Sequence, residues 1–551
     1  MSADRLRWLL LGVAAVGLVV HSFQYNFITD DAYISFVYSR NFADHGELVF
    51  NLGQYVEGYT NFLWTILIGL GMKAGLDADL VAKILGAVFA VVTLYVTCLT
   101  VERALGRKTP WATVPALLLA ASSGFACWTS GGLETQLFTM LVIIALDGLV
   151  AAEDVVPAGR SESGRLHPGG ESALYRTGIA LALAAMTRPE GLLVAAVFGF
   201  VRIACNLLSK RRFIGMPEIF AAILFLSLWA PWFAWRYWYY GYPFPNTYYV
   251  KATGPWANKG MAKEMYQHGA YYIWVWLKQT KLLYALPIAG LGLMAARPRT
   301  PRFALGLTCA LLAAVYIPYT ISVGGDFMGL HRFIMPLFVI AAIAIALGLE
   351  WLIGRLPEHM RTYAGPAAVV AVVGAFAASQ IQLTKKSLEW GNFKADRGII
   401  DTPAFLIAYT EDRATIGNAM QSCFHPDDFS IVGGAGAQPY FGNMRSIDVF
   451  GLVSARVAHE EPRIRARAGH TKFASDTLLA QYDPTFVFSC YSIHPNPFRP
   501  SLNCNPSFWL ARGYEQVTMW IPGLRQLGEP FTYYTFLAKK ARNFQCPGRV
   551  N

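Results

Sequence analysis

The sequence has few charged residues, and its acids are fewer than its bases. Only 15% of the 551 residues are Asp, Glu, Lys or Arg, whereas 54% are hydrophobic. Soluble domains carry roughly 25% charged residues, so we expect an integral membrane protein with a smaller soluble part. The excess of 46 basic over 35 acidic residues does not indicate a nucleic-acid-binding protein. The basic residues are instead concentrated in alternate loops between apolar segments.

The sequence also lacks the common motifs of soluble catalysis. It has no G-x-x-x-x-G-K-[ST] phosphate loop, no H-E-x-x-H helix and no G-x-S-x-G turn. The run GGAGAQ at 433–438 lacks the full G-x-G-x-x-G pattern, so we do not expect a dinucleotide site there. We expect no metal or cofactor to be required. An activated donor that arrives on a lipid fits an enzyme without a nucleotide motif.

Apolar segments recur along the first 383 residues. A helix needs about 20 largely apolar residues to cross the hydrocarbon, and we predict eleven spans. The first lacks a small-residue cleavage site after it, so we expect a retained anchor. The segment 62–75 contains three glycines and ends in a polar turn, which indicates an interfacial helix. The predicted spans are 7–24, 79–102, 111–129, 133–151, 174–187, 190–208, 217–238, 281–296, 303–322, 332–353 and 363–383.

The basic residues predict the orientation of these spans. A cytoplasmic N-terminus places nearly all Arg- and Lys-rich loops on the cytoplasmic side, as the positive-inside rule requires. Counting 62–75 as a span would reverse every later loop. We therefore expect a multi-pass protein of a bacterial inner (plasma) membrane with its C-terminus on the periplasmic, extracytoplasmic side. The basic loops lie near 103–108, 160–165, 210–212, 297–302 and 355–361.

Beyond residue 384 the composition becomes that of a soluble domain. Helix-like pieces alternate with short apolar strand-like pieces, which is typical of an α/β domain. We therefore predict a polytopic α-helical membrane domain of about 11 helices at 1–383, with an outer loop at 24–78. A C-terminal α/β domain occupies 384–551. Both Asp427-Asp428 and the alternating Arg463, Arg465 and Arg467 are interpreted as solvated surface, with glycan binding as the alternative for the arginines.

The eight cysteines fall into two groups. Four lie in the predicted exported domain, where they permit two disulfides whose pairing the sequence leaves open. The other four lie in apolar spans, where we expect buried free thiols. The first group is Cys423, Cys490, Cys504 and Cys546, and the second is Cys98, Cys127, Cys205 and Cys309.

The outer ends of the predicted spans carry many ionisable residues. Charged groups near a bilayer are costly and are usually paired or functional, although any single one can simply end a helix. The cytoplasmic ends, in contrast, hold cations and few acids. We predict that the outer residues share one polar cavity. They are Asp30, Asp31, Glu57, Glu134, Arg188, Glu190, Lys251, Asp326, His331 and Arg332.

Acids beside Arg, Lys and His at a bilayer surface suit a lipid-phosphate substrate. A carboxylate can take the proton of an acceptor hydroxyl, and Arg or Lys can neutralise a departing phosphate. The aromatic stretch 232–249 is interpreted mainly as an interfacial belt. Within it, Asn246 and Tyr249 are predicted sugar contacts.

These motifs resemble a known family. The acid pair after the first span, the segment ending in VEGYTNFLW, and the motifs TSGGLE, TRPEG and VGGDFM…HRF resemble the GT-C class of polytopic glycosyltransferases. Within it the chain is similar to the arabinofuranosyltransferase branch, typified by the mycobacterial terminal β-(1→2) enzyme. The resemblance covers the membrane region. The chain departs from the branch in the second half of VEGYTNFLW and in a shorter exported domain.

The resemblance implies an inverting transfer of a sugar from a polyprenyl-phosphate donor on the non-cytoplasmic face. The branch implies D-arabinofuranose and a cell-envelope glycan acceptor, which the exported domain helps to bind. Another sugar, or a protein or lipopolysaccharide acceptor, is the nearest alternative. A lipid-linked sugar transporter and a non-catalytic scaffold are the rivals from other classes. We expect a monomer that contacts the bilayer and no nucleic acid.

The resemblance also assigns roles to individual residues. The catalytic carboxylate is Asp30 or Asp31; we take Asp30 as the base and Asp31 as its orienting neighbour, with the reverse left open. The predicted ligands of the donor phosphate are Arg188, Lys251, His331 and Arg332. The predicted sugar or acceptor contacts are Glu57, Tyr59, Asn61, Glu134, Glu190, Asn246, Tyr249 and Asp326.

Overall fold

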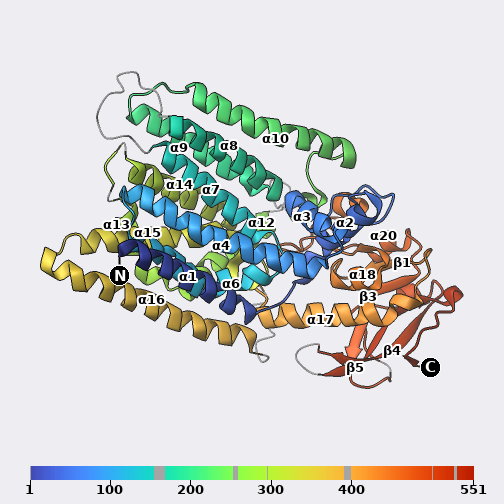
Figure 1. The fold of residues 1–551 in the computed structure, drawn as a ribbon. Coiled ribbons are helices and arrows are strands. Elements are labelled where there is room, and N and C mark those ends of the chain that lie inside the picture. Colours follow the sequence, from blue (N-terminus) through green and yellow to red (C-terminus); the bar gives the residue numbers. More distant parts are fainter. Residues whose placement is uncertain are drawn as a thin grey trace.

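The structure is a computed structural model, and it places a helical bundle beside a smaller α/β part. Figure 1 shows that the chain begins in the bundle and ends in the α/β part. The fold is therefore an α-helical membrane domain with a C-terminal α/β domain, as the sequence predicts. The residues that the structure describes are 2–153, 168–251, 259–294, 296–298, 300–389, 399–498, 500–525 and 530–550.

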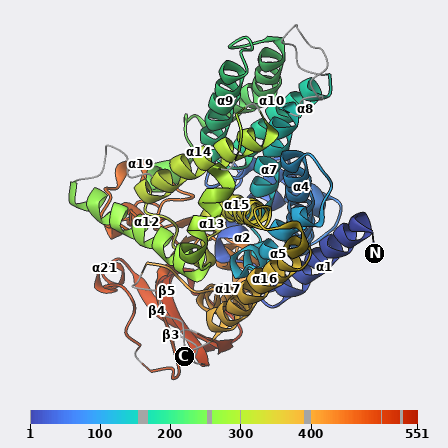
Figure 2. The same ribbon diagram turned by 90° about the vertical axis from the view of Figure 1, so that its left-hand side faces the viewer.

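Among the described residues, eight helices have the length and apolar composition needed to cross a membrane. This number defines a multi-pass membrane protein. Figures 1 and 2 place α8, α9 and α10 together at one edge of the bundle. The eight are α1 (Ala3–Phe23), α4 (Ala78–Leu105), α7 (Thr135–Ala152), α9 (Glu190–Leu208), α10 (Met216–Tyr240), α14 (Pro301–Ser322), the span Gly329–Ile353 formed by η2 (Gly329–Ile334) and α15 (Met335–Ile353), and α16 (Glu358–Leu388).

The other three predicted spans are also helical but less regular. One is a broken span with a 66° bend, made of η1 (Pro110–Thr113) and α5 (Val114–Ala121) followed by α6 (Ser123–Ser130). The remaining two are α8 (Pro168–Thr187) and the short α13 (Leu282–Met294). A helix therefore lies at each of the eleven predicted positions. One more, α12 (Lys259–Gln279), was not predicted because its charged residues mask its apolar stripe.

The outer loop after the first span folds into two short helices. They are α2 (Asp30–His45) and α3 (Phe62–Lys73), and α3 is too short to span a bilayer. A short helix is thus confirmed within 62–75, and its interfacial position stays a prediction. Gly46 ends α2 with a φ of 74°, a left-handed conformation that costs glycine little. Figure 1 places α2 between the bundle and the α/β part.

The α/β part contains a six-stranded mixed sheet with the order β2-β1-β3-β5-β4-β6. The first three strands are parallel and the others pair antiparallel. The sequence predicts the α/β class but not the antiparallel half. The strands are β1 (Phe429–Val432), β2 (Arg445–Asp448), β3 (Phe486–His494), β4 (Tyr514–Leu524), β5 (Phe531–Lys539) and β6 (Arg549–Val550).

Helices cover both faces of this sheet. The long α17 (Pro403–Met420) packs Ile416 and Met420 against one apolar face. Trp509 and Leu479 pack against the other face. The short helical elements are α11 (Asn246–Lys251), η4 (Gln421–Cys423), α18 (Ala437–Gly442), α19 (Ala455–Glu460), α20 (Asp476–Ala480), α21 (Ser507–Leu510) and η6 (Lys540–Arg542).

Two disulfides join the cysteines of the α/β part. The pairs are Cys423–Cys546 and Cys490–Cys504, and the four cysteines of the bundle are free and buried. Both expectations are confirmed.

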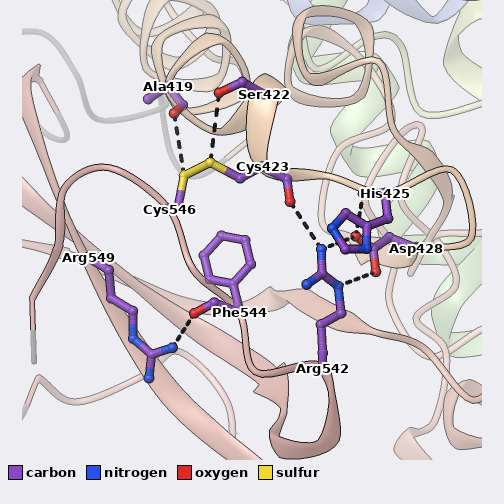
Figure 3. Close-up of a disulfide and its surroundings, with 9 residues drawn as sticks. All are labelled: Ala419, Ser422, Cys423, His425, Asp428, Arg542, Phe544, Cys546 and Arg549. Atoms are coloured by element: carbon purple, nitrogen blue, oxygen red, sulfur yellow. Dashed lines mark hydrogen bonds and ion pairs between the residues drawn. A yellow bond between two sulfur atoms is a disulfide. The ribbon is translucent and has the colours of Figure 1, made fainter.

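The prediction that Asp427-Asp428 is a solvated turn is half wrong. Asp427 is exposed, whereas Asp428 is buried and pairs with Arg542 at 2.9 Å. Asp428 also accepts a hydrogen bond from the backbone of His425. Figure 3 shows this ion pair beside the disulfide between Cys423 and Cys546. Asp428 therefore holds the end of the chain against the sheet.

The two parts are joined by buried hydrogen bonds between the outer loops and the sheet. Asn51 exchanges two bonds with the backbone of Ser446, of 2.9 and 3.0 Å. The Asn246 side chain donates to the carbonyls of Gly451 and Leu452 at 2.6 and 3.1 Å. These contacts fix β2 and the loop that follows it against the outer loops of the bundle.

Candidate functional site

A cavity of about 310 Å³ with charged side chains in its wall lies where the bundle meets the α/β part. Its wall includes seven of the ten ionisable residues that the sequence analysis groups together. Leu452, Ala468 and Gly469 of the α/β part complete the wall. The seven are Asp31, Glu134, Arg188, Glu190, Lys251, Asp326 and Arg332.

Asp31 lies in the first turn of α2 and lines this cavity. The N-terminus of a helix favours negative charge. Among the described residues, no hydrogen bond or ion pair engages its carboxylate. Withdrawal from water raises the pKa of Asp31, and the positive charges of Lys251 and Arg332 partly offset this rise. An unpartnered carboxylate of this kind is suited to accept a proton.

Asp30 points away from the cavity and towards the α/β part. Its Oδ1 accepts a hydrogen bond of 2.8 Å from the backbone N–H of Ala437, at the start of α18. Burial raises the pKa of Asp30 to about 6, although the bond from Ala437 and the charge of Arg413 favour the ionised form. Among the described residues, the carboxylate of Asp30 thus has a hydrogen-bond partner, whereas that of Asp31 has none.

The loop that follows β1 fits closely around Asp30. A β-carbon on Gly436 would lie 2.0 Å from the Asp30 backbone oxygen, so only glycine fits there. This loop contains the GGAGAQ run for which no dinucleotide site is expected. It contacts a carboxylate of the same chain.

Three cations face the cavity, and they differ in their partners. Arg332 pairs with Asp326 at 2.7 Å. Arg188 is shared between Glu134 at 3.6 Å and Glu190 at 3.3 Å. In the described part of the chain, Lys251 has no carboxylate within ion-pair distance. Lys251 is therefore the cavity cation that is free to meet an anion from outside.

Tyr59 and Asn61 also line the cavity. The amide of Asn61 donates to Glu134 at 3.0 Å and accepts a bond from Ser35 at 3.0 Å. The Tyr59 hydroxyl lies 3.0 Å from that of Tyr240. Asn61 therefore connects the loop after α2 to the cavity wall, and Tyr59 connects it to α10.

Three predicted contacts lie outside the cavity wall, and they have structural partners. Glu57 pairs with Arg236 at 2.6 Å, and burial raises the pKa of Glu57 to about 7. Asn246 is used in the bonds to the α/β part described above. The ring of Tyr249 packs against that of His459 at an angle of 47°, with the centroids 4.2 Å apart.

His331 lies behind the cavity rather than in its wall. Its Nε2 lies 3.0 Å from the Gln279 side chain. Leu330 and His331 both have positive φ angles, of 57° and 63°, which is costly for residues other than glycine. This kink directs the next residue, Arg332, into the cavity. His331 is thus placed to orient Arg332, and its predicted role as a ligand of the donor phosphate stays a prediction.

Sequence reasoning missed several residues of the site. Arg236 was overlooked although an arginine at the outer end of a span is a detectable signal. Tyr319, which lines the cavity and donates to Glu190 at 3.3 Å, resembles any other aromatic residue of a span. No local signal relates Ala437 to Asp30, because they are 407 residues apart.

The arginines interpreted as a solvated face are half-buried against the bundle, so that interpretation is wrong. Arg463 donates to the Tyr249 carbonyl at 2.9 Å. Arg467 pairs with Asp401 at 3.0 Å. Burial raises the pKa of Asp401 to about 6.

Comparisons with known proteins place these observations in a wider group. The chain is 28% identical over 337 residues to a terminal beta-(1->2)-arabinofuranosyltransferase of Corynebacterium glutamicum, with 57% of this chain and 47% of the relative aligned. It is 27% identical over 363 residues to the enzyme of that name from Mycobacterium tuberculosis, covering 61% and 54% of the two chains. The chain thus spans about half the length of these curated relatives.

The fold is GT-C-like. The structure resembles crystallised ArnT from Cupriavidus metallidurans bound to undecaprenyl phosphate, with a TM-score of 0.59 and 12% sequence identity over 97% of this chain and 98% of that chain. Residues 406–538 match a family described as a domain of unknown function, DUF8728.

Proposed function

We propose that this protein is an inverting glycosyltransferase that uses a polyprenyl-phosphate sugar. The unpartnered carboxylate of Asp31 carries this proposal, because it faces a cavity that also holds Lys251 and Arg332. A base opposed by cations is what transfer from a phosphate leaving group requires. The structural neighbour bound to undecaprenyl phosphate supports this class of donor.

The reaction proceeds in one displacement at the anomeric carbon. Asp31 accepts the proton of the acceptor hydroxyl while that oxygen bonds to the anomeric carbon. The bond from this carbon to the phosphate oxygen breaks, and its electron pair leaves with the prenyl phosphate. Lys251 and Arg332 neutralise the charge that develops there. The phosphate leaves without further activation, so we expect no metal to be required.

Asp31, and not Asp30, is the base in this proposal. Asp30 is committed to Ala437 by a hydrogen bond and sets the position of α2. This reverses the order of roles preferred in the sequence analysis. It also gives the α/β domain a role in positioning the base, beyond the expected role in acceptor binding.

The names of the relatives support arabinofuranose as the sugar, and we propose the D form and a cell-envelope glycan acceptor. We also propose the predicted topology, with the N-terminus in the cytoplasm and the α/β domain outside. In this arrangement 1–383 form the catalytic membrane domain and 384–551 the outer domain.

The test is donor turnover by the purified full-length protein in detergent. A panel of prenyl-phosphate sugars is offered with arabinan, protein and lipopolysaccharide acceptors, with and without a chelator. We expect prenyl-phosphate release from the arabinofuranose donor, unaffected by the chelator. Release from another donor alone would correct the sugar. Absence of release from every donor and acceptor pair would refute the proposed function.

A further inference from the structure

A basic hairpin, residues 461–473, closes the side of the cavity that belongs to the α/β domain. An isolated antiparallel β-bridge between Arg463 and Lys472 pairs the two arms of this hairpin. Near its tip, Ala468 and Gly469 form part of the cavity wall. The hairpin is therefore a rim of the site, and a substrate that enters past the α/β domain meets it.

The hairpin is held in place from the bundle side. Arg463 donates to the carbonyl of Tyr249, and Thr471 donates to that of Val250. Both acceptors precede Lys251, the unpaired cation of the cavity. The hairpin is thus anchored to the two residues that directly precede the cavity cation.

Three arginines at alternate positions give this rim its charge. Arg467 is neutralised by Asp401. In the described ranges, no carboxylate lies within ion-pair distance of Arg463 or Arg465. A guanidinium has five N–H donors, and Arg465 donates one hydrogen bond, of 2.7 Å, to the carbonyl of His470. In the described residues each guanidinium is therefore held by one hydrogen bond and keeps donors for a ligand.

Aromatic rings lie next to these charges. The Arg465 guanidinium lies 5.2 Å from the ring centre of Phe450 and 5.8 Å from that of Phe473. Phe450 and Phe327 each pack against His470, at 4.6 and 4.7 Å. Rings beside cations provide apolar contact for a sugar and charge for an anionic substituent.

We propose that the basic hairpin binds an acceptor glycan that carries a phosphate or carboxylate on or next to the sugar that receives the transfer. The inference rests on the proposed function and names the acceptor class. Lys251 and Arg332 serve the donor phosphate, so the cations of the rim are available for a second anion. A neutral glycan would leave two half-buried guanidinium groups without a counter-charge.

The test uses the full chain in phosphatidylcholine nanodiscs and two labelled hexasaccharides. One is hexagalacturonate, with a carboxylate on each sugar, and the other is neutral maltohexaose. We expect the wild type to bind hexagalacturonate at least tenfold more tightly, because one charge-assisted contact contributes about tenfold. The double variant Arg463→Gln, Arg465→Gln should lose this preference. Arg512→Gln, an exposed control in the same domain, should keep it.

Three outcomes would overturn the inference. They are equal binding of the two probes by the wild type, an unchanged preference in the folded double variant, and displacement by dihexanoyl-phosphatidylglycerol at lower concentrations than by inorganic phosphate. The last would assign the hairpin to lipid headgroups. If the glutamine variant does not fold, Arg463→Lys, Arg465→Lys should fold and keep the preference. Wild-type donor turnover in the same preparation separates a failure of this inference from a failure of the proposed function.

Discussion

The close fit of Gly436 against Asp30 predicts that the α/β domain controls the chemical step. A β-carbon on Gly436 would lie 2.0 Å from the backbone oxygen of Asp30, whereas ordinary contacts begin at 3.4 Å. A backbone oxygen cannot rotate away, so Gly436→Ala must shift α2 or the loop by roughly 1 Å. A displacement of that size costs about 100-fold in rate. The neighbouring Asp31 moves with the helix.

The same loop provides a graded series of controls. A β-carbon on Gly433 would have no atom within 4 Å, so Gly433→Ala should leave turnover unchanged. At Gly434 it would meet the Tyr409 hydroxyl at 2.9 Å and the Asp30 Oδ2 at 3.0 Å. These are side-chain atoms that can move, so Gly434→Ala should have an intermediate effect. Overpacking of this kind costs about 1–3 kcal/mol of stability.

The assay is release of prenyl phosphate by each purified variant, with the melting temperature as a measure of folding. We expect turnover to fall in the order Gly433→Ala, Gly434→Ala, Gly436→Ala, with all three proteins folded. Wild-type turnover by a folded Gly436→Ala would refute the argument. It would mean that the contact with the α/β domain does not position the base.

The remaining predictions concern stability and pH. Arg236→Met leaves Glu57 buried without its partner and should cost about 3–5 kcal/mol, seen as a lower melting temperature that a second change, Glu57→Leu, restores. Removing the Cys423–Cys546 disulfide, whose cysteines are 123 residues apart, should lower the free energy of unfolding by about 5 kcal/mol. Removing the Cys490–Cys504 disulfide, whose cysteines are 14 residues apart, should lower it by about 3 kcal/mol. Equal losses in denaturant titrations would contradict this prediction. The base must be ionised to accept a proton, and the pKa of Asp31 is raised above its usual 3.8. We therefore expect kcat/KM to rise with pH, with a midpoint above 3.8. A kcat/KM that does not change with pH on the acidic side would contradict this prediction. The contribution of Asp31 to folding stability changes in the opposite direction to kcat/KM. The folded state holds this proton more tightly than the unfolded state, so the protein loses stability as pH rises through this range.

Most of the membrane architecture follows from the sequence. Eleven apolar segments and the basic loops between them are enough to place the helices, because a bilayer constrains length and composition strongly. The group of outer charged residues can also be identified from the sequence, since ionisable residues near a membrane are costly and are usually paired or functional. Seven of those ten residues line the cavity. Helix α12 escaped prediction because its stripe is interrupted by charges such as Lys263 and Glu264.

The arrangement within the site was not predictable in the same way. Adjacent acids such as Asp30 and Asp31 look equivalent in the sequence, and the structure distinguishes them by the hydrogen bond from Ala437 to Asp30 and by the cavity that Asp31 lines. The arginines of the basic hairpin have the composition of a solvated surface. The half-buried position of Arg463 depends on its contact with α11, which lies more than 200 residues away in the sequence, and that of Arg467 depends on Asp401.

The central claim is that Asp31 removes the proton of the acceptor and that Asp30 positions Asp31. Prenyl-phosphate release should therefore be measured for Asp31→Asn and Asp30→Asn in parallel, with both proteins shown to be folded. We expect Asp31→Asn to lose about 100- to 10,000-fold in turnover. Asp30→Asn keeps an oxygen that accepts the bond from Ala437, so it should remain within about tenfold of the wild type. Full turnover by Asp31→Asn, or a larger loss in Asp30→Asn, would contradict the account.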